Sequence, residues 1–317
     1  MLNIQPLFAI SFNDIGVVAT FIIIGLGLAW LLWRSIKGHE VDRRIIFIFI
    51  FVAVIAPIYF TMTFKFVATP IVRALYDKIE SLPEGSTVLL SYDFDPAMAP
   101  EVQPMANAIS RHCLVKGHKI IYMCLFATGQ GQLERTFDEV IRPDFPDKVD
   151  GVDYVNLGYK AGNEGVLNVI ITDFQKMFPT DVNTVPYDSI EIFDNIKSCK
   201  DVDFIVSMGG GKPGIKEWIL FVGDPGDIPM ATGVAAVVAP QMYPYYPNQL
   251  LGLLGGVKGA AEYENTLTDN YPQFADMATP AIVMMGPQTL AHLVIMAFII
   301  IGNFLFFINR KKERKNA

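Results

Sequence analysis

Cysteine is scarce in this chain of 317 residues, which contains only Cys113, Cys124 and Cys199. The number is odd, and no two of the three have the CxxC spacing. Cys113 lies near the end of a predicted helix and Cys124 at the far end of the strand that follows it. Their backbones are therefore expected to lie beyond the ~7 Å that a disulfide allows. The sequence argues against a disulfide scaffold, and we expect three buried, small apolar side chains.

Several signatures of catalysis and metal binding are missing as well. The chain has no HExxH motif and no GxSxG motif, and its four histidines show no metal-ligand spacing. It has no internal repeat of about 20 to 50 residues and no low-complexity segment. We therefore expect no bound metal and no cofactor.

Positive charge is absent from residues 1–16 and from residues 259–309. Three long apolar runs, residues 17–33, 45–64 and 290–308, each approach the ~20 residues that a helix needs to cross a bilayer. Lysine and arginine gather between the first two runs and after the third, at Arg34, Lys37, Arg43, Arg44 and residues 310–315. The positive-inside bias therefore predicts that residues 34–44 and 309–317 are cytoplasmic and that residues 67–287 lie outside the cytoplasm.

Two alternatives treat the first run as a cleaved signal peptide and the second as a buried core helix. A signal peptide carries basic residues before its apolar segment and small residues at its end. Here the basic residues follow the run, which ends in Trp30, Leu31, Leu32 and Trp33. The sequence favours three retained helices in a multi-pass protein of the cell membrane, surrounded by membrane lipids.

Three regions are predicted from these boundaries. Residues 1–66 hold two transmembrane helices, residues 67–287 form one extracytoplasmic domain, and residues 288–317 hold the third helix and a basic tail. The middle region is strongly acidic, because it contains 28 of the 32 acidic residues while nine of the 25 lysines and arginines lie in the cytoplasmic parts. Such a surface repels phosphate backbones, so nucleic acid is not expected as a partner.

Strand-like and helix-like segments alternate through the middle region. Strands are predicted at residues 87–92, 119–126, 152–157, 203–208 and 229–238. Helices are predicted from Asp95, an N-cap followed by proline, to about residue 113, and at residues 132–141, 166–178, 189–199, 215–221 and 249–266. Strands joined by helices form right-handed crossovers and a parallel sheet covered on both faces. The predicted fold class is therefore α/β, with three transmembrane helices flanking one Rossmann-like domain, and His112 and His118 are expected beside a surface turn.

The loops that leave the carboxyl ends of parallel strands gather along one edge, where such folds bind ligands. Four loops qualify, and their candidate ligand-binding residues are Asp93, Asp95, Thr128, Gln130, Lys160, Asn163, Glu164, Gly209, Gly210, Gly211 and Lys212. The glycines allow a ligand to approach the backbone, and free amides beside Lys212 would attract an anion. Ile215 stands where a phosphate-binding loop has lysine, so a nucleotide site has little support. The alternative is that the glycines only form a tight turn.

Asp93 and Asp95 are two residues apart at the end of a strand and point the same way, an arrangement in which two carboxylates can share a divalent cation. Against this, Asp95 is already expected to cap a helix, and no further acid or histidine lies nearby in sequence. The sequence therefore argues against metal binding at this position.

A segment rich in tyrosine, proline, leucine and glycine follows residue 240. Tyrosine supplies large contact area at low entropic cost, and glycine lets another backbone come close. The predicted interface residues are Tyr243, Tyr245, Tyr246, Leu250 and Leu254. The alternative is that this segment packs on the domain's own sheet.

These features predict a binding or assembly subunit of a larger membrane complex. Its partners would be other membrane subunits, either copies of itself in a homo-oligomer or different chains in a hetero-complex. The alternative is a membrane-anchored enzyme that acts on a small anionic substrate at the carboxyl edge of the sheet. Because no catalytic motif is present, the sequence favours binding over catalysis.

Overall fold

The computed structural model describes residues 8–10, 15–37, 42–60, 62–275 and 279–316. Residues 38–41 of the predicted cytoplasmic loop and residue 317 of the tail lie outside the described residues. The chain separates into two compact units, one formed by residues 1–66 and 282–317 and the other by residues 67–281.

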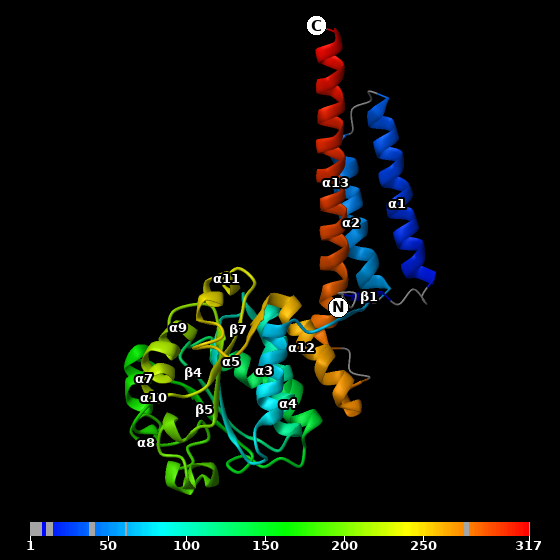
Figure 1. The fold of residues 1–317 in the computed structure, drawn as a ribbon. Helices are drawn as coiled ribbons and strands as arrows, with labels where there is room; N and C mark the ends of the chain where they lie inside the picture. The colour runs from blue at the N-terminus through cyan, green and yellow to red at the C-terminus, as the bar shows by residue number, and fades with distance from the viewer. Residues whose placement is uncertain (1–7, 11–14, 38–41, 61, 276–278, 317) are drawn as a thin grey trace, which may run out of the picture. The chain divides into compact units, whose positions relative to one another are not determined.

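A six-stranded parallel sheet forms the centre of the second unit (Figure 1). Its strands are β3 (Thr87–Asp93), β4 (Lys119–Cys124), β5 (Tyr154–Tyr159), β6 (Phe204–Gly209), β7 (Met230–Val234) and β8 (Leu253–Gly255). They are arranged in the order β5-β4-β3-β6-β7-β8. Counted along the chain this order is 3-2-1-4-5-6, the doubly wound order of dinucleotide-binding folds. The parallel Rossmann-like sheet is therefore confirmed.

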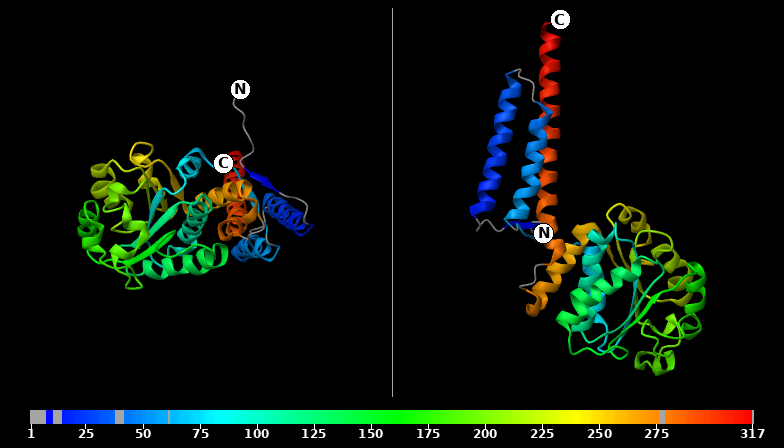
Figure 2. Two further views of the ribbon diagram at one scale, coloured as in Figure 1. Left: turned by 90° about the horizontal axis from the view of Figure 1, so that it is seen from below. Right: turned by 180° about the vertical axis from the view of Figure 1, so that it is seen from behind.

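Helices cover both faces of the sheet. On one face, α3 (Pro70–Ser81), α4 (Ala99–Val115), α5 (Gly129–Thr136) and α12 (Gly256–Asn270) pack together. On the other face lie α7 (Glu164–Ile170), α8 (Phe174–Met177) and α9 (Ile215–Trp218). The views of Figure 2 show the same layers. Strand residues on both faces are buried, as expected for a fully covered parallel sheet.

Short helical segments complete the connections. A π-helical segment, η1 (Phe137–Ile141), and α6 (Arg142–Asp144) continue α5, and η5 (Ile219–Gly223) and α10 (Asp224–Gly226) continue α9. The remaining segments are η2 (Tyr187–Ser189), η3 (Glu191–Asp194), η4 (Cys199–Asp201), α11 (Ala239–Met242), η6 (Tyr243–Tyr245) and η7 (Pro272–Phe274).

Two predicted helices are replaced by other structure. Residues 189–199 form short 3-10 turns rather than one helix. The predicted helix at residues 249–266 begins instead as β8, which pairs with β7 at Thr232 and Leu253, and becomes α12 only at Gly256. Gly256 has a φ of +62°, a left-handed conformation that separates the strand from the helix. Glycine is a poor helix former, and the glycines up to residue 256 accompany a strand instead of the predicted helix.

The start of α4 also differs from the prediction. The helix begins at Ala99, and Asp95 caps the preceding turn by accepting a hydrogen bond from the Met98 amide at 3.0 Å. Nearly every residue of α4 is buried, including the polar Gln103, Asn107 and His112. This burial requires hydrogen-bonding partners on the neighbouring helices.

The first unit contains α1 (Ile15–Ile36), α2 (Arg43–Tyr59) and most of α13 (Pro280–Asn316). Residues Val18–Ile36 and Pro280–Ile308 are long and apolar enough to cross a membrane. Few residues of these two stretches are buried within the chain, unlike those of a core helix in a soluble protein. The helix α2 has 17 residues and is shorter than these stretches, so the third crossing stays a prediction.

A small sheet and close helix packing complete the first unit. The strands β1 (Phe8–Ile10) and β2 (Phe64–Phe66) pair antiparallel, so Phe64 belongs to a strand rather than to the end of an apolar helix. Gly27 of α1 lies against the ring of Phe49 on α2. The amide of Asn303 on α13 donates to the Ile299 carbonyl of its own helix at 2.9 Å. Gly27 and Asn303 thus have partners inside the chain.

Candidate functional site

Asp93 lies at the point where the strand order reverses, between the carboxyl ends of β3 and β6. Its carboxylate is fully buried and accepts hydrogen bonds from the Ser91 hydroxyl at 2.7 Å, the Leu125 amide at 2.8 Å and the Trp218 indole at 2.9 Å. Burial raises the pKa of Asp93 to about 6, although these hydrogen bonds act to lower it. Asp93 therefore holds the ends of two strands and α9 together.

Asp93 and Asp95 bind different protein donors, since Asp95 caps the turn at Met98. No group of three or more histidine, cysteine or acidic side chains placed to hold a metal occurs among the described residues. All three cysteines are buried with free thiols. At the point where the strand order reverses, the Asp93 carboxylate and the Trp218 indole are both fully buried and hydrogen-bonded to each other.

The glycine loop after β6 is packed tightly against its own domain. A side chain at Gly209 would collide with the Asp93 carbonyl, and one at Gly211 would collide with the Phe126 ring. The amide of Gly214 donates to the Glu217 carboxylate at 2.9 Å, and the Lys212 ammonium lies 3.5 Å from the Glu164 carboxylate. The Gly214 amide thus has a protein partner, and the close packing of Gly209 and Gly211 favours the tight-turn interpretation for the glycines.

Gly209, Gly211 and Gly214 also match the GxGxxG spacing of dinucleotide-binding turns. In those proteins the motif follows the first strand of the sheet, and an acidic residue ends the second. Here the motif follows the fourth strand, and the next strand ends at Val234. The spacing therefore occurs outside the structural context that gives it meaning.

A cavity of about 410 Å³ opens at the carboxyl end of β5. Its lining residues are Gln130, Leu157, Gly158, Tyr159, Lys160, Phe178, Pro179, Thr180, Asp181 and Val182. Two predicted ligand-binding residues, Gln130 and Lys160, are thus brought together. The Lys160 ammonium lies 5.5 Å from the centre of the Phe178 ring and has no carboxylate partner among the described residues. Thr128 and Asn163 are exposed but do not line this cavity.

A second cavity, of about 310 Å³, lies beside the glycine loop. It is lined by Gly210, Gly211, Lys212, Ile215, Lys216, Glu217, Val238, Gln241 and Met242. Lys216 was not among the predicted ligand-binding residues, because it lies inside α9 rather than in a loop. The signal that could have identified it was its position in the sequence, two residues after the last glycine of the loop.

The predicted interface residues divide into two groups. Tyr243 is exposed, and Tyr245 and Tyr246 are partly buried. Leu250 and Leu254 are fully buried, and Leu254 lies in β8 at the edge of the sheet. These two leucines pack inside the domain, as the alternative interpretation expected, and do not form an exposed contact surface.

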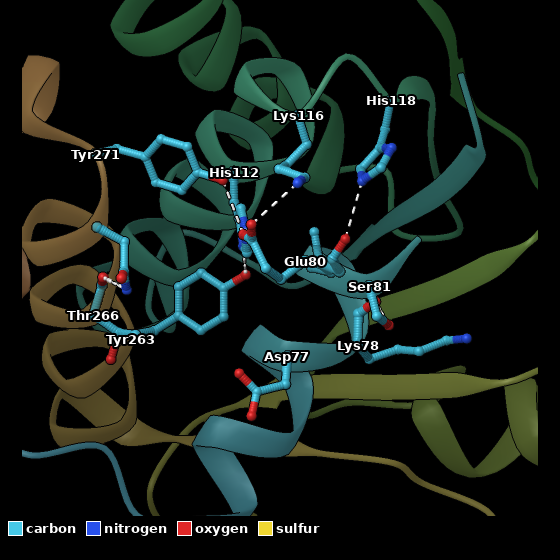
Figure 3. Close-up of polar contacts among 12 residues, drawn as sticks. Asp77, Lys78, Glu80, Ser81, His112, Lys116, His118, Tyr263, Thr266 and Tyr271 are labelled. Atoms are coloured by element: carbon cyan, nitrogen blue, oxygen red, sulfur yellow. Dashed lines mark hydrogen bonds and ion pairs between the residues drawn. The ribbon is translucent and has the colours of Figure 1, made fainter. Parts of the chain in front are cut away.

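A polar cluster joins α3, α4 and the region of α12 on one face of the sheet (Figure 3). Glu80 on α3 contacts His112 Nε2 at 2.9 Å, the Lys116 ammonium at 3.0 Å and the Tyr271 hydroxyl at 2.9 Å. His112 Nδ1 lies 2.6 Å from the Tyr263 hydroxyl of α12. Both His112 and Tyr263 are fully buried. The cluster therefore connects three helices through one carboxylate and one imidazole.

His112 and His118 are thus buried, and the prediction that they border the surface was wrong. The reason is that α3 and α12 cover the end of α4, and His118 Nε2 reaches the Ile79 carbonyl at 3.0 Å. Burial lowers the pKa of His112 to about 4. Burial acts to raise the pKa of Glu80, but hydrogen bonds from His112, Lys116 and Tyr271 outweigh it and lower that pKa to about 2. At neutral pH a neutral His112 therefore donates from Nε2 to ionised Glu80 and accepts from Tyr263.

No protein-family model matches the chain, and no curated protein matches it in sequence. The strand order and the apolar helices define its class as a doubly wound α/β domain in one chain with long apolar helices. Conclusions about function therefore depend on the geometry of the carboxyl edge.

Proposed function

We propose that this chain is an integral membrane protein whose α/β domain lies outside the cytoplasm and binds a small anionic ligand. It would act as the binding subunit of a larger membrane complex. The observation that carries the proposal is Lys160 at the 410 Å³ cavity, where its ammonium has no carboxylate partner among the described residues.

The surroundings of Lys160 support an anionic ligand. The domain is strongly acidic, and Lys160 supplies positive charge to a cavity whose lining also contains Asp181. The Gln130 amide lies in the same lining and can donate a further hydrogen bond, while Phe178 and Leu157 supply apolar contacts. A few polar groups in a partly apolar concave site are typical of small-molecule binding.

Replacing Lys160 with glutamine tests this proposal. We expect the purified full-length protein to bind sulfate, phosphate or a short dicarboxylate, and Lys160→Gln to weaken that binding at least tenfold, which corresponds to about 1.4 kcal/mol. Isothermal titration calorimetry in mild detergent provides the measurement. Lys200→Gln, which removes an exposed lysine outside both cavities, is the matched control.

Equal affinity in Lys160→Gln and wild type, or no binding of any of these anions by the folded protein, would contradict the proposal. The same experiment separates binding from the alternative of a membrane-anchored enzyme. If the bound compound is recovered chemically changed after incubation, the carboxyl edge is a site of catalysis.

Membership in a complex is the second part of the proposal. Tyr243 is an exposed aromatic side chain on the domain, and aromatic residues are enriched at protein interfaces. The long apolar helices also leave many large side chains uncovered, which lipids or partner helices would contact. Partner chains would be copies of this protein or different membrane subunits.

A further inference from the structure

The second cavity combines an apolar wall with a cationic rim. It lies between the glycine loop with α9 on one side and α11 on the other. Ile215, Val238 and Met242 form the apolar part of the lining. Lys212, Lys216, Glu217 and Gln241 contribute the polar part. A ligand that fits this lining needs both an apolar and a charged portion.

The charge at the rim is available to a ligand. The Lys216 ammonium donates to the Gln241 side-chain oxygen at 3.2 Å and has no carboxylate partner in the described part of the chain. Lys212 pairs with Glu164 at 3.5 Å, but its side chain is 75% exposed, and exposed ion pairs contribute little. The Glu217 carboxylate is directed at the Gly214 amide. Two lysines can therefore approach one anionic group.

Apolar side chains beside this lining remain exposed. Val237, next to Val238, is 81% exposed, and Tyr243, next to Met242, is 53% exposed. Leu220, one helical turn after Lys216, is 62% exposed. These three residues adjoin, in sequence, the segments that line the cavity, so apolar surface is exposed on those segments.

From these observations we infer that the second cavity binds an amphiphilic anion. Its carboxylate or phosphate contacts Lys216 and Lys212, and a short apolar chain lies against Ile215, Val238 and Met242. This chemistry is shared by free short-chain amphiphiles and by anionic membrane lipids. The site is separate from the Lys160 cavity, so it does not depend on the function proposed above.

Three related probes test the inference on the full-length protein in phosphatidylcholine nanodiscs. Hexanoate has both the charge and the chain, acetate has only the charge, and hexanamide has only the chain. Ligand-observed NMR is expected to show hexanoate binding at least tenfold more tightly than either relative. The double variant Lys212→Gln with Lys216→Gln is expected to weaken hexanoate binding at least tenfold, and Met242→Gln to weaken it several-fold.

The control is Lys200→Gln, which should leave hexanoate binding unchanged because that lysine is exposed and lines neither cavity. Trp218 fluorescence reports whether each variant is folded, and if the double variant fails to fold, Lys216→Gln alone is used. Equal binding of acetate and hexanoate would overturn the inference in favour of a simple anion site. Equal binding of hexanamide, or unchanged hexanoate binding in the lysine variants, would also overturn it.

Nanodiscs that contain phosphatidylglycerol identify the source of the natural ligand. Weaker apparent hexanoate binding in those discs supports an anionic lipid as the occupant, because the lipid competes for the site. Unchanged binding supports a free amphiphile.

Discussion

At the residue scale, the chemistry of this domain depends on which charged groups have partners. The sequence directs attention to Lys212, which sits among glycines, yet that lysine pairs with Glu164. Lys160 and Lys216 have no carboxylate partner among the described residues, and both line cavities. Sequence spacing identified the edge of the sheet, but it could not show which ammonium groups are paired, because Glu164 and Lys212 come from different loops.

His112 gives the domain a pH-dependent stability. Its pKa is lowered to about 4 in the folded protein from an ordinary value of 6.5. The unfolded chain therefore binds the proton more readily between these values, so stability is lost as pH falls from about 6.5 to about 4. We expect His112→Asn to lose less stability over this window than wild type. Urea unfolding of the full-length protein in detergent, followed by fluorescence of the buried Trp218, provides the measurement.

Titrating groups that do not contact His112 remain in both proteins and cancel in this comparison, whereas Glu80 loses the His112 hydrogen bond that helps to lower its pKa. Asp93 acts in the opposite direction, because its pKa is raised to about 6 and its contribution is lost as pH rises toward that value. An identical slope in wild type and His112→Asn would show that His112 is not buried in its neutral form.

At the element scale, the junction between β8 and α12 depends on one glycine. Gly256 has a φ of +62°, and a side-chain carbon there would lie 2.7 Å from the Cβ of Ala236. We expect Gly256→Ala to lower the free energy of unfolding by about 1–2 kcal/mol or more, from the left-handed backbone alone. Gly165→Ala in α7 meets no atom within 4 Å and should be neutral or stabilising by up to about 1 kcal/mol. Urea unfolding of both variants measures the difference, and equal effects would contradict the β8–α12 assignment.

The same junction shows where sequence patterns stop being informative. Strands β3, β4, β5, β6 and β7 were predicted within a few residues, because each is an apolar run bounded by turn residues. The three residues of β8 carry no such pattern, and only their pairing with β7 makes them a strand.

The cluster of Glu80, His112, Tyr263 and Tyr271 was not predicted from the sequence, for a related reason. Its members are far apart in sequence, and the packing of α3, α4 and α12 brings them together.

At the scale of the whole molecule, the distribution of charge along the chain predicts on which side of the membrane the α/β domain lies. Basic residues flank the apolar runs on one predicted side, whereas the region between them carries most of the acidic residues. Among the residues that the structure describes, Val18–Ile36 and Pro280–Ile308 are the two helical stretches long and apolar enough to cross a membrane. If both cross, the side on which the domain lies depends on whether the chain also crosses between residues 37 and 280. With one crossing there, the domain lies on the side opposite to residue 37. Without a crossing, it lies on the same side as residue 37. The short helix α2 therefore decides on which side the domain lies.

Cysteine labelling of intact cells tests this topology. A membrane-impermeant maleimide should modify Val149→Cys, at an exposed position of the domain, and should modify Lys312→Cys in the basic tail only after permeabilisation. The reason is that α1, α2 and α13 would all cross, with both basic segments in the cytoplasm. The native cysteines are fully buried, so wild type should remain unlabelled and serves as the control. Labelling of Lys312→Cys but not Val149→Cys in intact cells would reverse the orientation. Labelling of both without permeabilisation would mean that the two positions share one side, so that α13 does not cross between them.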